Sequence, residues 1–274
     1  MSINIAVIAG TGMGQLLGEG VKKNTRTPFG KITYFELLID SRIKIIFIDR
    51  HHSCLGHFDL PHELNHRAYM WFLAEHDIQF VIATSAVGGI NGPNGIENLT
   101  VGSIGLPMDF VDLTQKPYTF AGRESGLVHE TAFHRSPINM FCLVLRDLIA
   151  HHVDCAHGIL SCVQGPRYET RAEALILRDV YQVNFAGMTT AVPEVILARE
   201  AAMHYLLLAN VTNMPLEDPP ADGAEVKVAI AQRQERLLKV IKCLIHILHG
   251  TPPEFKCECI KTPSVFQMCE QSQD

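Results

Sequence analysis

Small and polar residues follow nearly every predicted strand of this 274-residue sequence, at the point where the strand ends. These groups are Gly10-Thr11-Gly12, Arg50-His51, Thr84-Ser85-Ala86, Met188-Thr189 and Asn213. In open α/β sheets, ligands bind outside the carboxyl ends of the strands. The N–H groups of a glycine turn, an arginine and several hydroxyls suit an oxyanion such as phosphate. The pattern predicts an anion site, although each group alone also fits an ordinary turn or a surface ion pair.

A second candidate group is the segment Gly165-Pro166-Arg167-Tyr168-Glu169-Thr170, which precedes a predicted helix. It offers an aromatic face beside a carboxylate, as a pocket for a flat polar ligand would. The same residues equally fit a stable first turn of a helix, where an acidic side chain is favourable.

The segment HELNH at residues 62–66 matches the zinc-protease pattern H-E-x-x-H, with Glu63 as the general base. We expect a helix that starts at Pro61 and runs to His76, which would bring His62 and His66 onto one face. However, the residues that follow supply neither the glycine nor the third histidine of the extended pattern. A zinc hydrolase is therefore a remote alternative, and no metal site is predicted.

The elements that must position these residues alternate along the chain. Buried strands are expected at 3–10, 43–49, 79–85, 183–188 and 205–211, and helices at 61–76, 138–152, 171–181, 193–203 and 225–248. Continuous apolar strands between helices indicate an α/β fold with a mixed, largely parallel sheet flanked by helices. We expect one domain over residues 1–250 and a polar, cysteine-bearing tail over residues 251–274.

Composition limits the partners. The formal net charge of −6 argues against nucleic acid and anionic membranes, which need a cationic face. The apolar runs are shorter than the ~20 residues of a membrane span. Because MSINIAVIAG lacks the features of a signal peptide, we expect a cytoplasmic protein whose eight cysteines, including the pair Cys257 and Cys259, are free thiols.

Taken in order, several motifs resemble the trimeric purine nucleoside phosphorylase and methylthioadenosine phosphorylase family. They are IAGTGM, TPFGK, RH, PHELNHRA, VIATSAVGG, QGPRYETRAE, GMTTAVPEVILARE and ANVTN, spread over about residues 3 to 230. The resemblance implies the nucleoside phosphorylase fold, a homotrimer, and cleavage of a purine nucleoside by inorganic phosphate. Phosphate is then a co-substrate, and no cofactor is implied.

The resemblance also assigns roles to individual residues. For phosphate binding it implies Thr11, Arg50, His51, Ser85, Ala86 and Thr189, with Arg50 and His51 as charge-assisted donors. An extra residue in GMTTAVPE leaves open whether Thr189 or Thr190 takes the last of these roles. It implies catalytic roles for Asn213 and His57, and substrate contacts from Tyr168, Glu169, Met188, Asn213, Pro215, Val226 and, from a neighbouring subunit, His129.

Within this family, the pair Glu169 and Asn213 is similar to that of the 6-oxopurine enzymes, in which the glutamate accepts the N1–H of the base. Val226 stands where methylthio-specific relatives have an apolar residue. Together these implications favour S-methyl-5′-thioinosine, which phosphate would split into hypoxanthine and 5-methylthioribose-1-phosphate. Alternatives are a methylthioadenosine or inosine/guanosine phosphorylase, and a nucleoside-binding protein without activity.

Overall fold

The computed structural model describes residues 4–10, 20–52, 58–92, 98–127, 134–217, 223–250 and 256–271, without the side chains of residues 223–234 and 270–271. Within these ranges, no helix is both long enough and apolar enough to cross a membrane.

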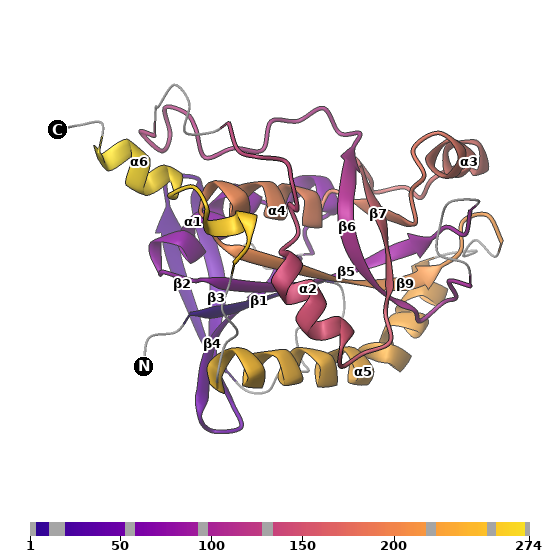
Figure 1. The fold of residues 1–274 in the computed structure, drawn as a ribbon, viewed down its shortest axis with the longest axis horizontal. Coiled ribbons are helices and arrows are strands. Elements are labelled where there is room, and N and C mark those ends of the chain that lie inside the picture. The colour runs from indigo at the N-terminus through magenta and orange to yellow at the C-terminus, as the bar shows by residue number, and fades with distance from the viewer. Residues whose placement is uncertain are drawn as a thin grey trace.

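A nine-stranded mixed sheet forms the centre of the molecule (Figure 1). Its strands are β1 (Ile5–Ala9), β2 (Gly20–Thr27), β3 (Gly30–Ile39), β4 (Ile43–Asp49), β5 (Phe80–Gly89), β6 (Ile104–Asp112), β7 (Ala156–Val163), β8 (Phe185–Met188) and β9 (His204–Asn213). They are ordered β2-β3-β4-β1-β5-β8-β7-β6-β9. Because β9 pairs with both β6 and β5, strands β5, β8, β7, β6 and β9 close into a ring.

Helices cover the sheet on opposite sides (Figure 1). They are α1 (His66–Glu75), α2 (Leu143–Ala150), α3 (Arg171–Asp179), α4 (Ala191–Glu200), α5 (Gly223–Gly250) and α6 (Val265–Gln271), with single 3-10 turns η1 (Pro61–Glu63) and η2 (Glu258–Ile260). One apolar cluster joins α1 and α4 to the sheet, and a second joins α2 and α5 to it. Strands β1 and β9 are buried along their whole length, as apolar strands covered on both faces should be. The predicted α/β fold with a mixed sheet is confirmed.

The single helix expected from Pro61 to His76 is wrong. The chain forms the short turn η1, then an extended break at Leu64, and α1 begins only at His66. Asn65 causes this start, because its side-chain oxygen accepts the N–H of Ala68, 3.1 Å away, as a helix cap. His62 and His66 therefore lie on different elements, and the H-E-x-x-H geometry is not formed.

Part of the predicted C-terminal tail packs against the domain. Cys257 and Cys259 belong to the apolar cluster on the α5 side, whereas Val265 belongs to the cluster on the α1 side. The described cysteines form no disulfide.

Candidate active site

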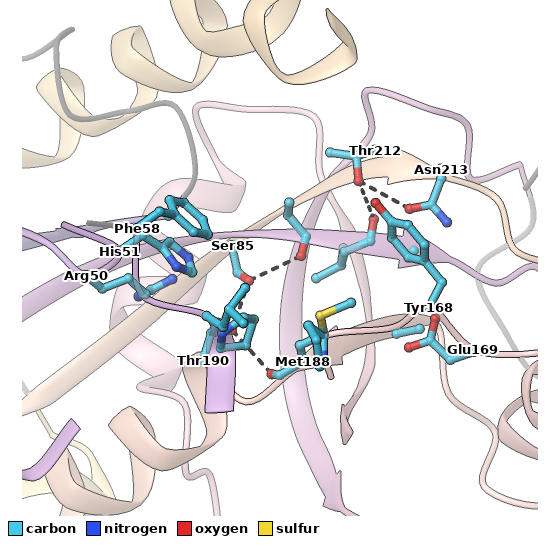
Figure 2. Close-up of a pocket in the computed structure, with 18 residues that line it drawn as sticks. Arg50, His51, Phe58, Ser85, Tyr168, Glu169, Met188, Thr190, Thr212 and Asn213 are labelled. Carbon is cyan, nitrogen blue, oxygen red and sulfur yellow. Dashed lines mark hydrogen bonds between the residues drawn. The ribbon is translucent and has the colours of Figure 1, made fainter. Parts of the chain in front are cut away.

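A cavity of about 370 Å³ opens at the carboxyl ends of the central strands (Figure 2). Its volume lies in the usual range for small-molecule sites. Eight of the predicted site residues line it: Arg50, His51, Ser85, Ala86, Tyr168, Glu169, Met188 and Asn213. Figure 2 shows Arg50, His51, Ser85 and Thr190 toward one end, Tyr168, Glu169 and Asn213 toward the other, and Met188 between them. The two ends are called the anion end and the base end below.

The anion end is built around Arg50, which follows β4. Its Nη1 donates to the carbonyl oxygen of Thr84 at 2.6 Å, and its Nη2 to Glu194 Oε2 at 2.9 Å. Its Nε also lies 2.9 Å from Glu194 Oε1, and neither side chain is exposed to solvent. Although burial alone would lower the pKa of Arg50, attraction to Glu194 raises it. Arg50 therefore carries a fixed positive charge at the wall of the cavity.

Two tyrosines complete the surroundings of Glu194. The hydroxyl of Tyr69 donates to Oε1 at 2.7 Å, and that of Tyr205 donates to Oε2 at 2.6 Å. Burial and the adjacent carboxylate raise the pKa of both tyrosines well above the usual value, so both remain donors. Sequence reasoning missed this network, although Glu194 lies within the quoted motif GMTTAVPEVILARE. A glutamate on the apolar helix α4 was the signal, because a buried carboxylate requires a partner.

His51 is uncharged at neutral pH. Burial lowers its pKa to about 4, despite the hydrogen bond of Nδ1 with the carbonyl oxygen of Asp59, 2.9 Å away. Because Nδ1 must donate to that carbonyl, Nε2 is left as an acceptor. The ring stacks on Phe58, with centroids 4.8 Å apart. His51 thus lies at the anion end as expected, but as a neutral imidazole it can accept a phosphate O–H and does not supply a positive charge.

The hydroxyl facing the cavity beside Ser85 belongs to Thr190. Its Oγ1 lies 3.1 Å from Ser85 Oγ, and both residues line the cavity. Thr189 instead donates its hydroxyl to the carbonyl oxygens of Val163 and Gln164, at 3.0 and 2.9 Å, and does not line the cavity. Of the two candidates, Thr190 therefore faces the anion end, and Thr189 faces inward.

The base end combines an aromatic ring, a carboxylate and an amide. Tyr168 and Glu169 come from the loop before α3, and Asn213 ends β9. The hydroxyl of Thr212 lies 3.3 Å from Asn213 Oδ1 and 3.3 Å from the carbonyl oxygen of Val87. A bond to Oδ1 holds the amide with Nδ2 free to donate. Burial raises the pKa of Glu169.

Close packing explains the glycine beside Asn213. A Cβ on Gly88 would lie 2.8 Å from Pro215 Cγ and 3.4 Å from Asn213 Nδ2. Pro215 therefore supports the base end from behind and does not line the cavity. Gly165 has a φ of +62°, and a Cβ there would lie 2.9 Å from Met188 Sδ.

Four predicted site residues are not placed. Thr11, His57 and His129 lie outside the described residues, and Val226 lies in α5 with its side chain outside them. Among the described residues, the structure adds Phe58, whose ring covers His51 and lines the cavity. The described part of the cavity has no group of side chains arranged to hold a metal ion.

The arrangement separates an anion site from a site for a planar polar ring within one cavity. A bound oxyanion would meet the guanidinium of Arg50, which is paired with Glu194, and two hydroxyls. A flat ring would meet Tyr168 and the polar groups of Glu169 and Asn213. A short linking group between them would lie over Met188.

Comparison with known proteins agrees with this geometry. Residues 4–246 match the model of the phosphorylase superfamily. An S-methyl-5′-thioadenosine phosphorylase of Hyperthermus butylicus is 33% identical over 270 residues, covering 93% of this chain and 92% of the relative. A probable S-methyl-5′-thioinosine phosphorylase of Methanocaldococcus jannaschii is 29% identical over 263 residues, covering 93% and 96%.

The fold also matches a solved structure. The methylthioadenosine phosphorylase of Schistosoma mansoni in complex with adenine has a TM-score of 0.78 and 23% identity, covering 91% of this chain and 92% of that one. From the family match and the curated relatives together, the chain belongs to the purine nucleoside and methylthioadenosine phosphorylase family of enzymes, within the phosphorylase superfamily.

Proposed function

We propose that this enzyme cleaves a 6-oxopurine nucleoside with inorganic phosphate, and that its preferred substrate is S-methyl-5′-thioinosine. The products are hypoxanthine and 5-methylthioribose-1-phosphate. The observation that carries the proposal is the presence of Glu169 and Asn213 at the same end of the cavity, beside the ring of Tyr168.

Glu169 and Asn213 complement the edge of a 6-oxopurine. An ionised Glu169 accepts the N1–H of hypoxanthine, and the amide Nδ2 of Asn213 donates toward O6 and N7. Adenine has an acceptor at N1, so its N1 would face the carboxylate with no proton between them. An unmet buried pairing of this kind costs about 1–3 kcal/mol. The donor N1–H also stabilises the charged carboxylate, opposing the burial that raises the pKa of Glu169.

The proposed reaction uses both ends of the cavity. Phosphate at the anion end, held by Arg50, Ser85 and Thr190, attacks the anomeric carbon. The ribose becomes cation-like above Met188, and the purine departs with its bonding electron pair. Because negative charge then develops on the imidazole ring of the purine, the Asn213 donor at N7 favours the transition state over the ground state.

Preference for the methylthio group rests on the sequence position of Val226. An apolar residue there, in place of a histidine that bonds a 5′-hydroxyl, favours the thioether by about 1–3 kcal/mol. In a trimer, His129 of a neighbouring subunit would complete this part of the pocket, and size-exclusion chromatography with light scattering tests the trimer.

The test is base release from methylthioinosine, methylthioadenosine, inosine and adenosine, each with and without phosphate. We expect phosphate-dependent hypoxanthine release, fastest from methylthioinosine. Adenine release at a similar or higher kcat/KM would contradict the assigned base choice. Inosine cleaved faster than methylthioinosine would contradict the 5′ assignment, and no release from any substrate would contradict the whole proposal.

The variant Glu169→Gln tests the carrying observation directly. A glutamine can donate to adenine N1, and it loses the charge-assisted bond to N1–H, worth about 1.5–3 kcal/mol. The ratio of kcat/KM for methylthioinosine over methylthioadenosine should therefore fall about tenfold or more. Glu235→Gln is the matched control, because Glu235 lies on α5 outside this cavity and pairs with Lys239 at 2.9 Å. An unchanged ratio in Glu169→Gln would refute the role of Glu169.

A further inference from the structure

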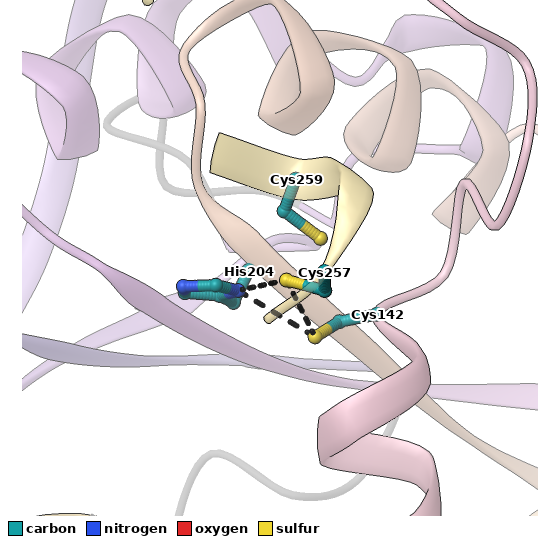
Figure 3. A group of neighbouring side chains, drawn as sticks. All are labelled: Cys142, His204, Cys257 and Cys259. Atoms are coloured by element: carbon teal, nitrogen blue, oxygen red, sulfur yellow. Dashed lines mark hydrogen bonds between the residues drawn. The ribbon is translucent and has the colours of Figure 1, made fainter. Parts of the chain in front are cut away.

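Four buried side chains gather at the amino end of β9, opposite the end that carries Asn213 (Figure 3). They are Cys142, His204, Cys257 and Cys259, and their Sγ and Nδ1 or Nε2 atoms all lie within 4.8 Å of one another. Within the described part of the chain, no other group of His, Cys, Asp or Glu side chains has the arrangement of metal ligands. The three segments that carry these side chains lie far apart in the sequence, so only the fold brings them together.

We propose that these four side chains bind one Zn²⁺ ion in a closed structural site. Three cysteines and one histidine are a common ligand set of structural zinc, and thiolate sulfur favours zinc over the oxygen-preferring cations Mg²⁺ and Ca²⁺. On binding, each of the three thiols releases its proton to solvent, the imidazole coordinates as the neutral base, and no oxidation occurs.

The distances between the ligand atoms are close to those of tetrahedral coordination. With Zn–S bonds of ~2.3 Å and a Zn–N bond of ~2.0 Å, neighbouring ligand atoms should lie ~3.8 Å apart for S···S and ~3.5 Å for S···N. Cys142 Sγ lies 4.0 Å from Cys257 Sγ and 3.5 Å from His204 Nδ1. Cys257 Sγ lies 3.3 Å from the same nitrogen. Cys259 Sγ lies within 4.8 Å of the other three ligand atoms, so shifts of up to about 1 Å would place one ion among all four.

Rigid elements hold the ligands. Cys142 directly precedes α2. Its backbone N–H donates to the carbonyl oxygen of Tyr205 at 2.9 Å, and Tyr205 is the residue after His204, so this bond holds the two ligands together. The imidazole of His204 stacks on Phe80, with centroids 5.2 Å apart and planes at 17°. Cys257 and Cys259 flank the start of the turn η2. Each of the four ligands thus lies in a regular element or directly before one.

The site is structural and not catalytic. All four ligands are buried, with exposed fractions of 0% for Cys142, 2% for Cys259, 5% for His204 and 7% for Cys257. They complete a four-coordinate shell, so no position remains for water or substrate. His204 and Asn213 are the first and last residues of β9, which at ~3.3 Å per residue separates the zinc site from the base end by roughly 30 Å. The ion would fasten the C-terminal segment to the amino end of β9.

The direct test is metal analysis of the full chain, purified with a reducing agent and without chelator, then supplied with Zn²⁺ and freed of excess by gel filtration. We expect about one zinc per chain by plasma mass spectrometry. Replacement with Co²⁺ should give the visible absorption bands of a tetrahedral ion with thiolate ligands. These two measurements use the unmodified chain, so they decide the proposal even where a variant does not fold.

Variants then locate the ion. Cys142→Ser and Cys257→Ser should lose zinc and the Co²⁺ bands. Cys155→Ser, at a half-buried thiol outside the group, and His62→Ala, in the HELNH segment, should keep both. The unmodified chain without zinc after supplementation would overturn the proposal, as would reductant-resistant disulfides among these cysteines. Zinc retained in Cys257→Ser or lost in His62→Ala would also overturn it. Activity of the base-release assay plays no part in these outcomes.

Discussion

Replacing Glu194 by glutamine should strongly destabilise the fold, and the structure sets the size of the effect. The side chain is fully buried and receives two contacts from Arg50 and the hydroxyls of Tyr69 and Tyr205, at 2.6–2.9 Å. Glutamine keeps the shape but removes the charge. It also turns one acceptor oxygen into an NH₂ group, which faces donors.

The dominant cost is the buried Arg50 charge left without its counterion. Breaking a buried ion pair by removing one partner costs about 3–5 kcal/mol. For a chain of this size, each kcal/mol shifts Tm by about 2–4 °C, so we expect Tm to fall by roughly 6–20 °C. An exposed pair behaves differently. Glu235→Gln, which removes the partner of Lys239 on the surface of α5, should leave Tm nearly unchanged, because solvent screens an exposed pair.

The assay is urea unfolding followed by circular dichroism, with a thermal scan of the same samples. If the free energy of unfolding of Glu194→Gln stays within 1 kcal/mol of the unmodified protein, the network does not carry the stability assigned to it. Tyr69→Phe gives an intermediate case, because it removes one donor and leaves the charge pair intact. We expect a loss of about 1–2 kcal/mol from that variant.

Further predictions concern the pocket and its pH response. Thr190→Val should raise the KM for phosphate about fivefold or more, since an anion contact is lost, whereas Thr189→Val should lower stability and leave that KM unchanged; the reverse result would restore Thr189 to the anion site. Gly88→Ala should lower kcat/KM about tenfold or more in steady-state assays, because the new Cβ displaces Pro215; an unchanged kcat/KM would show that the base end tolerates the methyl group. Burial lowers the pKa of His66 to about 3, so the folded state binds fewer protons than the unfolded one, and stability should fall as pH decreases from about 6.5. Urea unfolding of His66→Leu should show a flatter dependence between pH 6.5 and 4, and an equal slope in both proteins would exclude this histidine as the cause.

The strands that the sequence predicted correctly are those buried on both faces. β1, β4, β5, β8 and β9 have apolar sequences and are mostly buried in the covered sheet. β2, β3, β6 and β7 were missed. In β2 the reason is plain, since its sequence GVKKNTRT is largely exposed and carries no apolar pattern. The predicted helix start at Pro61 is wrong for a local reason, because Asn65 caps α1 and the helix begins only at His66.

Where a motif lies at the end of a strand, the side chain that it indicates lines the cavity, as do Arg50, directly after β4, and Asn213, the last residue of β9. The sequence could not decide between the adjacent hydroxyls of Thr189 and Thr190, because which of the two faces the cavity depends on the local backbone after β8. Contacts between segments that are distant in the sequence could not be predicted from it. Nothing near Glu194 in the sequence indicates Arg50, and nothing near Cys257 indicates Cys142 or His204.

The closed ring of strands has a consequence for how the protein behaves in concentrated solution. Because β9 pairs back onto β5, β2 is the one described strand with an unpaired edge in this sheet. That edge carries Lys22, Lys23 and Arg26, and charged side chains on an exposed edge resist strand-to-strand aggregation between molecules. Self-association is therefore expected to use side-chain surfaces and not extension of the sheet, which keeps oligomer formation separate from amyloid-like growth.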